Sequence, residues 1–214
     1  MTSAELGARL RLIVITDRQA AAPRSIVEVV EAALQAGAPA IQLRDKTATA
    51  RALLEAGREL LPIVHGAGAL FFVNDRVDVA LALGADGVHV GPDDLPVRAI
   101  RGAVPRDFLI GTSTDDPKEA EALVADGADY IGCGTVYQTT TKPDAGNVLG
   151  PEGLDRVARA VAAPVVGIGG ITPGRAAEVA KTAAAGVAVV AAVMGATDVG
   201  RAVRTLLQPW TRIG

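Results

Sequence analysis

The chain has a single cysteine, Cys133, among its 214 residues. One cysteine cannot form a disulfide within the chain, and the absence of disulfides is typical of proteins from reducing compartments. The opening stretch, MTSAELGARLRLIVITD, holds only a short apolar run, which favours a β-strand over a secretory signal peptide. We therefore expect a cytoplasmic protein.

Long apolar runs and blocks of one charge sign are also absent. No apolar run reaches the roughly 18 residues that predict a membrane-spanning helix. The 21 Lys and Arg residues are spread among 24 Asp and Glu residues, for a net charge of −3. We therefore expect neither nucleic acid nor a membrane surface as a partner. The chain also lacks a linker or low-complexity tract, so we expect residues 1–214 to form a single domain.

Short β-branched runs recur between alanine-rich stretches with helical patterning, and several are apolar on both faces, as buried parallel strands are. The eight runs cover residues 10–17, 40–45, 70–75, 87–91, 108–114, 130–136, 164–170 and 186–193. Helical patterns fall between them, for example on residues 25–37, 76–84, 117–127 and 173–186. Many units end in a glycine that suits a helix C-terminus, namely Gly37, Gly84, Gly127 and Gly186.

Eight strand–helix units in a chain of this size predict an α/β protein with a (β/α)8 TIM barrel. A doubly wound open sheet is the alternative. Asp86 and Asp129 each follow one of the terminal glycines at the start of a strand, and we expect both to be structural.

Polar side chains gather at the carboxyl ends of the predicted strands, where barrels of this kind carry their active sites. Gln42 and Arg44 lie two residues apart and therefore point to the same face, which we expect to be the barrel axis. An arginine there needs an anion as its partner. An ion pair with Asp17 or Asp45 is the alternative that requires no ligand.

A cationic site is predicted where Arg44, Lys46 and Lys142 meet at one rim of the barrel. Asp75 and Asp94 lie between them in strand order, and they could neutralise these cations or cap helices. A sharper interpretation is Mg²⁺, which takes one or two protein carboxylates and completes its shell with water and substrate phosphates. Together these residues describe a clamp for a diphosphate.

A second anion site is predicted on the stretch IGGITPGRAAEV. Gly169 and Gly170 allow backbone N–H groups to approach a ligand, while Thr172 suits a helix N-cap and Pro173 a first helical turn. Helix N-termini attract phosphate, and barrels often bind phosphate after strands 7 and 8. A plain tight turn would also explain the glycines. The polar loop VYQTTTKPDAG lies between the two predicted sites.

Six motifs, in this order along nearly the whole chain, resemble the thiamine phosphate synthase (thiamine-phosphate pyrophosphorylase) family. They are VITDR, IQLRDK, FFVNDRVDVALALGADGVHVGPDDLP, IGTST, GADYIGCGTVYQTTTKPDAG and PVVGIGGI. The resemblance implies a TIM-barrel transferase of thiamine biosynthesis. Such an enzyme joins 4-amino-2-methyl-5-(diphosphooxymethyl)pyrimidine to 4-methyl-5-(2-phosphooxyethyl)thiazole, giving thiamine phosphate and pyrophosphate.

The resemblance also implies roles for individual residues. Contacts to the pyrimidine diphosphate are implied for Gln42, Leu43, Arg44, Asp45, Lys46 and Asn74. Mg²⁺ ligands are implied at Asp75 and Asp94, and further diphosphate contacts at Ser113 and Lys142. Contacts to the thiazole phosphate are implied for Thr139, Thr140, Thr141, Gly170, Val190 and Ala191. The catalytic set is then Arg44, Lys46, Ser113 and Lys142.

Two departures from the family pattern are visible. Ala191 stands where the family usually has serine, and this removes a hydroxyl from the predicted phosphate site. Because backbone N–H groups can still bind phosphate there, we expect weaker binding and retained activity. Asp45 stands where glutamate is common, which is a milder change.

The sequence offers no evident nucleophile–base pair. We expect Cys133 to pack in the core, while His89 could be a hydrogen-bonded core residue or a ligand contact. The family resemblance implies that the pyrimidine–diphosphate bond ionises first and that the thiazole nitrogen captures the cation. Such chemistry needs charge stabilisation more than acid–base help. We also expect residues 143–150 to act as a lid, and alanine-rich helix faces would suit a homo-oligomer.

Three other functions remain open at this point. A thiazole tautomerase of the same superfamily would have no diphosphate to expel. A phosphosugar isomerase or epimerase would need a positioned acid and base. A non-catalytic barrel could bind thiazole phosphate.

Overall fold

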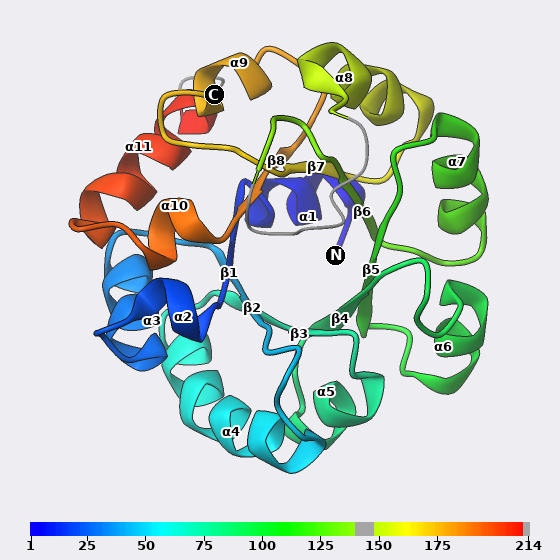
Figure 1. Cartoon of the computed structure of the whole chain (residues 1–214). Coiled ribbons are helices and arrows are strands. Elements are labelled where there is room, and N and C mark those ends of the chain that lie inside the picture. Colours follow the sequence, from blue (N-terminus) through cyan, green and yellow to red (C-terminus); the bar gives the residue numbers. More distant parts are fainter. Residues whose placement is uncertain (140–147, 212–214) are drawn as a thin grey trace.

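The computed structural model describes residues 1–139 and 148–211. Within these residues eight parallel strands follow one another around a closed barrel, and β8 pairs with β1 (Figure 1). The predicted (β/α)8 barrel is therefore confirmed, and the open sheet is excluded. The strands are β1 Leu12–Ile15, β2 Ala40–Leu43, β3 Leu70–Asn74, β4 Gly87–Val90, β5 Leu109–Ser113, β6 Tyr130–Cys133, β7 Val165–Ile168 and β8 Gly186–Val189.

Most of the helices surround this ring of strands, whereas α1 lies across one end of it (Figure 1). The helices are α1 Ser3–Arg9, α2 Arg18–Ala21, α3 Ile26–Gln35, α4 Ala50–Gly66, α5 Val77–Leu83, α6 Val97–Ala103, α7 Pro117–Ala125, α8 Gly150–Ala160, α9 Ala176–Val179, α10 Ala191–Met194 and α11 Val199–Thr211. Side-chain caps fix where several of them begin. The Ser25 hydroxyl accepts the Glu28 N–H while the Glu28 carboxylate accepts the Ser25 N–H, a capping box that starts α3.

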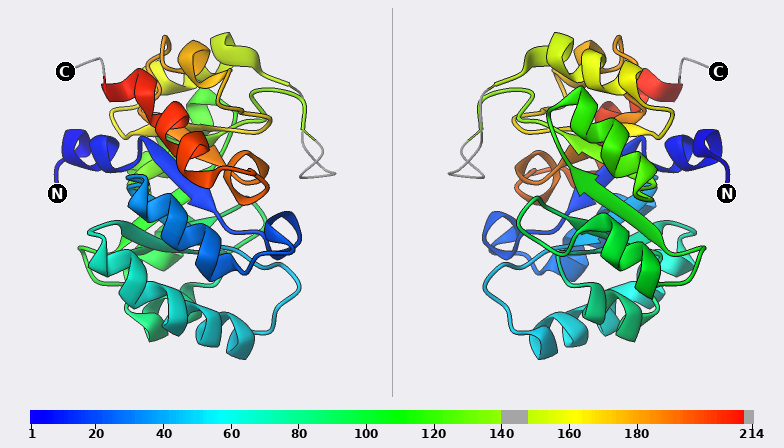
Figure 2. Two further views of the ribbon diagram at one scale, coloured as in Figure 1. Left: turned by 90° about the vertical axis from the view of Figure 1, so that its left-hand side faces the viewer. Right: turned by 90° about the vertical axis from the view of Figure 1, so that its right-hand side faces the viewer.

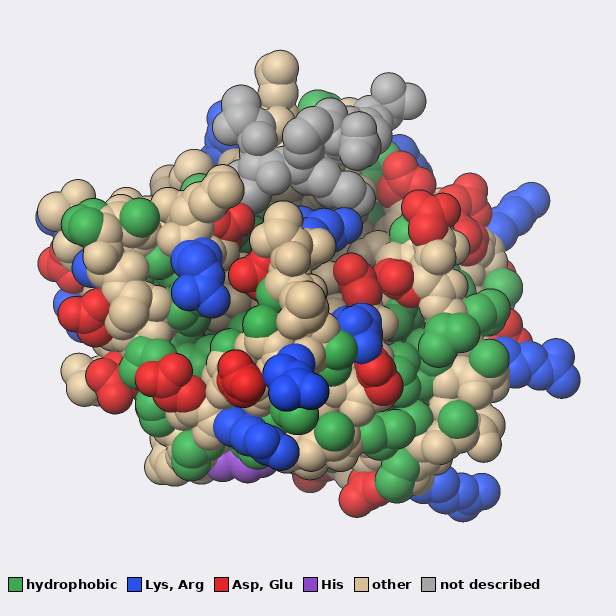
Figure 3. Space-filling model, turned by 60° about the horizontal axis from the view of Figure 1, so that its bottom comes forward, with side chains coloured by type: hydrophobic (Ala, Val, Ile, Leu, Met, Phe, Trp, Pro, Cys, Tyr) green, Lys and Arg blue, Asp and Glu red, His purple; other side chains and the backbone are tan. Residues whose placement is uncertain are grey.

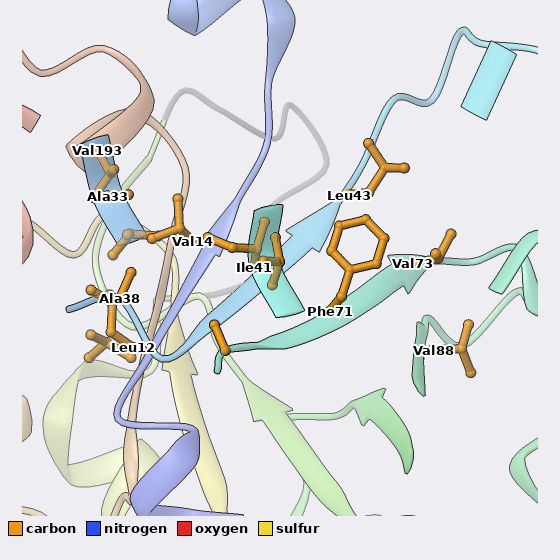
Figure 4. Close-up of a cluster of buried hydrophobic side chains, with 14 of the residues drawn as sticks. Leu12, Val14, Ala33, Ala38, Ile41, Leu43, Phe71, Val73, Val88 and Val193 are labelled. Atoms are coloured by element: carbon orange, nitrogen blue, oxygen red, sulfur yellow. The ribbon is translucent and has the colours of Figure 1, made fainter. Parts of the chain in front are cut away.

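The main hydrophobic core lies between the strands and the helices. Alternate residues of each strand point outward into it, including Val14 of β1, Ile41 of β2 and Phe71 of β3, which Figure 4 shows with their neighbours. These side chains are all fully buried. Outward-facing Ile41 and Leu43 confirm the predicted alternation along β2, because the side chain between them, Gln42, then faces the barrel axis.

A second core fills the barrel interior and is closed at one end by helix α1. Leu6 and Leu10 pack against inward-facing residues such as Ile13, Leu70 and Phe72. Figure 2 shows α1 at one end of the barrel, with α2 and α10 at the other. One end of the barrel is thus filled by apolar side chains, which leaves the carboxyl ends of the strands for a site.

Cys133 lies in the outer core and is fully buried, as expected. Burial raises the pKa of its thiol to about 12, and the charge of Asp115 acts in the same direction. Because the thiolate is the reactive form, we predict that the folded protein reacts far more slowly with a disulfide reagent at pH 8 than the urea-unfolded chain does. Equal reaction rates in the folded and unfolded states would contradict this assignment.

Three of the four predicted helix-terminal glycines have the expected left-handed backbone. Gly37, Gly84 and Gly127 have φ angles of 94°, 69° and 108°. The prediction for Gly186 is wrong, because this residue begins β8. Its lack of a side chain serves close packing instead, since a Cβ there would lie 2.2 Å from the carbonyl oxygen of Leu10.

The helix predicted on residues 173–186 is also wrong in length, because α9 covers only Ala176–Val179. Local side-chain hydrogen bonds end it. The Thr182 hydroxyl donates to the Val179 carbonyl and accepts from the Ala184 N–H, and Asp155 accepts from the Ala183 N–H. Such bonds give backbone groups partners outside a helix, so helical patterning alone overestimates the element.

Asp86 and Asp129 have the structural role expected of them. Asp86 accepts the N–H of Phe71 at 2.7 Å, and Asp129 accepts the N–H of Ile110 at 2.7 Å. Each carboxylate thereby ties the start of one strand to its neighbour, far from the carboxyl ends.

The outer surface is mixed in charge, with acidic and basic side chains beside one another on the face shown in Figure 3. In the described part of the chain, every helix falls short of the length and apolar character that a membrane crossing requires.

Candidate active site

A cavity of about 790 Å³ opens at the carboxyl ends of the strands. Its wall includes the last residues of β3 and β5, Asn74 and Ser113, and the loops that follow the strands. Eleven of the residues assigned to the site from the sequence line it. They are Gln42, Arg44, Lys46, Asn74, Asp75, Asp94, Ser113, Thr139, Gly170, Val190 and Ala191.

Two of the assigned side chains do not line the cavity. Leu43 packs in the outer core. Asp45 accepts hydrogen bonds from the N–H and hydroxyl of Thr47 and from the N–H of Ala48, and these bonds lower the pKa of its carboxyl. Neither residue lines the cavity, so the substrate contacts assigned to Leu43 and Asp45 stay predictions.

Three assigned residues, Thr140, Thr141 and Lys142, lie outside the described part of the chain. The lid predicted at 143–150 also lies largely outside it, because residues 143–147 are not described. These predictions stay predictions.

Hydrogen bonds to its backbone fix Arg44 in position, and this residue lines the cavity. The Thr16 hydroxyl accepts the Arg44 N–H at 2.9 Å and donates to the Arg44 carbonyl at 3.2 Å. Among the described residues the guanidinium forms no ion pair, so the alternative of pairing with Asp17 or Asp45 is wrong. An unpaired cation in a cavity wall favours an anionic ligand.

The two carboxylates proposed as Arg44 partners are engaged elsewhere. Asp17 accepts the N–H of Ala20 at 2.9 Å and caps α2. Asp45 lies 3.7 Å from the guanidinium of Arg18. The local turns of the chain thus use both acids and leave Arg44 without them.

Asp75 and Asp94 face each other in the cavity wall. Burial raises the pKa of Asp75 to about 6, and the hydrogen bond with Asp94 and the charge of Asp94 act in the same direction. Lys46 and Arg44 oppose the rise through their charges. Two partly buried carboxylates this close need either a shared proton or a cation between them.

The backbone around this pair is also unusual. Asp75 has a φ angle of 62°, a left-handed conformation that few residues other than glycine adopt. Asp94 is fixed because it accepts the N–H of Gly91 at 2.8 Å.

No cluster of three potential metal-ligating acidic, histidine or cysteine side chains occurs in the described residues. A pair of carboxylates in a wide cavity fits Mg²⁺, which takes few protein ligands and keeps water and phosphate oxygens as the others.

A hydrogen-bonded chain crosses the floor of the cavity. The His89 Nδ1 lies 2.9 Å from the Tyr130 hydroxyl, and its Nε2 lies 2.9 Å from the Ser113 hydroxyl. His89 is thus both a hydrogen-bonded residue and a cavity residue. Burial lowers the pKa of His89 to about 4, although the charge of Asp94 acts in the opposite direction. A neutral imidazole at pH 7 holds Ser113 in place without adding charge.

The glycines after β7 form a narrow turn beside the loop that follows β6. Gly169 and Gly170 have φ angles of 98° and 62°, and a Cβ on Gly170 would lie 2.6 Å from the Tyr137 carbonyl oxygen. Only glycine fits both conditions. The Gly170 N–H has no acceptor among the residues that the structure describes, which leaves it available to an anion in the cavity.

The helix-capping role predicted for Thr172 and Pro173 is wrong. Helix α9 begins at Ala176, its N-cap is Arg175, and no side chain caps it. Residues before it form a turn in which the N–H groups of Arg175 and Ala176 bond to the Thr172 carbonyl. The anion site here therefore rests on the glycine turn, without a helix N-terminus.

Among the cavity-wall residues that were not assigned from the sequence, Tyr130 and Arg175 carry polar groups that matter for the site. A signal for Tyr130 was present, because the tyrosine ring needs the space left by Gly111 on the neighbouring strand. A Cβ on Gly111 would lie 2.1 Å from that ring. Arg175 lies in a stretch assigned to a helix, and no sequence pattern indicated that it reaches the cavity.

Known proteins are similar to this chain in sequence over almost its full length. A family model described as thiamine monophosphate synthase matches residues 12–193. A thiamine-phosphate synthase of Roseiflexus castenholzii is 50% identical over 193 residues, which are 90% of this chain and 85% of the relative. One of Moorella thermoacetica is 45% identical over 201 residues, 94% of this chain and 96% of the relative.

The fold agrees with the sequence comparison. The solved structure of thiamine phosphate pyrophosphorylase from Pyrococcus furiosus has a TM-score of 0.89 and 45% identity to this chain. The superposition covers 97% of this chain and 98% of that one. The chain therefore belongs to the thiamine monophosphate synthase family.

Proposed function

We propose that the chain catalyses the transfer reaction of its family. It joins the pyrimidine of a hydroxymethylpyrimidine diphosphate to a thiazole phosphate, giving thiamine phosphate and pyrophosphate. The observation that carries this proposal is one cavity with two different anion sites. Arg44, Lys46 and the Asp75–Asp94 pair form one of them, and the Gly170 turn forms the other.

The first site suits a diphosphate leaving group. Arg44 and Lys46 supply positive charge, and the hydroxyl of Ser113, which His89 holds, supplies a donor. Asp75 and Asp94 would hold Mg²⁺, which would neutralise charge that develops on the diphosphate oxygens. Lys142, assigned from the sequence, would add a further cation at the same group.

The second site suits the single phosphate of the thiazole substrate. The Gly170 N–H and the backbone at Val190 and Ala191 face the same cavity. Ala191 offers no hydroxyl, so backbone donors must bind the phosphate there. Thr139 and, from the sequence, Thr140 and Thr141 complete this side.

With one substrate bound at each anion site, the reactive carbon of the pyrimidine substrate and the thiazole nitrogen lie in the cavity between the two sites. The pyrimidine–diphosphate bond breaks with both electrons leaving on the diphosphate, and the thiazole nitrogen supplies the electron pair of the new bond. Apolar side chains of the barrel interior, Ile13, Ile15, Val166 and Ile168, form the adjoining wall. They keep water away from the reactive carbon, because water would compete with the thiazole nitrogen.

The cavity gives less support to the rival functions. A tautomerase would have no diphosphate for Arg44 and Lys46 to bind. An isomerase or epimerase needs a positioned acid and a positioned base. The His89 imidazole is hydrogen-bonded at both nitrogens and is a poor candidate for either role.

Purified protein mixed with both substrates and Mg²⁺ tests the proposal. We expect pyrophosphate and thiamine phosphate in equal amounts, and loss of both products when either substrate is omitted or a chelator is added. Binding of thiazole phosphate without any turnover would favour a non-catalytic barrel. Isomerisation of a thiazole phosphate without the pyrimidine substrate would favour a tautomerase.

A further inference from the structure

Arg175 lies at the edge of the cavity, immediately before helix α9, and its side chain is anchored at two points. Its Nη1 donates to the carbonyl oxygen of Gly170 at 2.9 Å. Its guanidinium carbon also lies 4.6 Å from the centre of the Tyr137 ring, which places the cation over the ring. Stacking on an aromatic ring and hydrogen bonding at the edge are both typical of a positioned arginine.

The anchoring leaves most of the guanidinium donors unused. A guanidinium carries five N–H groups, and one of them is used by Gly170. Arg175 forms no ion pair within the described part of the chain. The nearby carboxylate of Glu178 instead accepts the hydroxyl of Tyr137 at 2.8 Å, and this bond fixes the ring beneath the cation.

The position of Arg175 is distinct from that of the other cations. The arginine and lysine side chains that line the cavity, among the described residues, are Arg44, Lys46 and Arg175. Arg44 and Lys46 act electrostatically on Asp75. Arg175 is bonded to Gly170, whose N–H has no acceptor among the same residues. The side of the cavity with the glycine turn thus has a cation of its own.

We infer that Arg175 is a specificity-determining residue that binds the phosphate of the second substrate together with the Gly170 N–H. Its planar, always-charged guanidinium can give two parallel hydrogen bonds to a phosphate, whereas a backbone N–H gives one. Arg175 then selects the phosphorylated thiazole over its free alcohol. The inference rests on the proposed function, because it assigns the glycine turn to the thiazole phosphate.

Steady-state kinetics of an Arg175→Met variant test this role, since methionine keeps much of the side-chain volume and removes the charge. We expect the KM for the thiazole phosphate to rise about tenfold or more, which corresponds to about 1.4 kcal/mol of binding free energy. The KM for the pyrimidine diphosphate should not change. With the unphosphorylated thiazole alcohol, wild type and variant should give the same kcat/KM.

An Arg175→Lys variant should fall between wild type and Arg175→Met, because lysine keeps the charge without the planar fork. Arg58→Met serves as the matched control, since Arg58 is an exposed residue of α4 and does not line the cavity. It should match wild type with every substrate. Equal losses with the phosphate and the alcohol would show that Arg175 only holds the Tyr137 and Gly170 loops together, and would overturn the inference.

Calorimetric titration with the thiazole phosphate and with its alcohol separates this inference from the proposed function. If wild type releases no pyrophosphate, the proposed function fails, but binding still reports on Arg175. Tighter binding of the phosphate by wild type, lost in Arg175→Met and partly kept in Arg175→Lys, supports the inference. Equal affinity of wild type for phosphate and alcohol would overturn it even if turnover is normal. The same titration tests Arg175→Lys alone if Arg175→Met does not fold.

Discussion

Replacing Asp75 with asparagine is expected to lower turnover about 100-fold or more and to leave the fold intact. Asp75 faces Asp94 in the cavity wall, beside the cations Arg44 and Lys46. Loss of one group that stabilises developing charge typically costs about 2.7–4 kcal/mol of barrier. Asparagine tolerates a left-handed backbone, so the φ angle of 62° at this position can be kept.

The same variant should lose its response to Mg²⁺. A cation that binds only the folded state raises its stability. We therefore expect Mg²⁺ to raise the melting temperature of wild type but not that of Asp75→Asn. Melting curves followed by circular dichroism, with and without Mg²⁺, measure this difference.

Asp107→Asn is a matched control, because Asp107 is an exposed acid in the loop that precedes β5, away from the carboxyl ends of the strands. It should keep normal turnover and a normal response to Mg²⁺. Near-normal turnover of Asp75→Asn at saturating substrates would contradict the placement of the diphosphate site.

Arg44→Met is the second variant for which we expect a loss of about 100-fold or more in turnover. Arg44 has no ion-pair partner among the described residues, so its charge is available to the leaving group. Methionine removes the charge and keeps an extended side chain. Initial rates of pyrophosphate release at saturating thiazole phosphate measure the effect.

Stability should not fall with activity in this variant. Removing a partly buried charge relieves its desolvation and also loses its attraction to Asp75, so the free energy of unfolding should change little. The Arg58→Met variant should match wild type in both measurements. A large loss of stability in Arg44→Met would indicate that Arg44 has a structural partner, and would weaken its assignment to the substrate.

Much of the fold could be predicted because each strand carries its own signal. Apolar runs separated by helical patterns indicate parallel strands, and eight such units suit a closed barrel. Period-two alternation then placed Gln42 inside and Ile41 and Leu43 outside, as the structure confirms. These properties depend on local pattern, which a sequence shows directly.

Structural features that depend on contacts between distant segments of the chain could not be predicted from the sequence pattern. Helix α9 is short because Thr182 and Asp155 bond to backbone groups near its end, and Asp155 belongs to another helix. The role of Gly186 follows from the approach of Leu10, more than 170 residues away in the sequence. Neither neighbour is visible from the pattern around the residue itself.

The candidate site also contains residues that the sequence pattern predicts and residues that it does not. Residues at strand ends, such as Arg44, Asp75 and Ser113, could be located from the barrel rule and from the family resemblance. Arg175 could not, and the signal for Tyr130 lay only in Gly111 of the neighbouring strand, because each side chain depends on a partner on another strand or loop. Tyr130 contacts His89, and Arg175 contacts Tyr137 and Gly170.

A crystal structure of the protein with thiamine phosphate, pyrophosphate and Mg²⁺ is the most direct measurement of the central claim, that a divalent cation and two basic side chains receive the departing diphosphate. We predict a metal ion bound to carboxylate oxygens of both Asp75 and Asp94, with pyrophosphate oxygens in its shell and in contact with Arg44. Pyrophosphate bound elsewhere, or a density map with no metal beside these two carboxylates, would contradict the account.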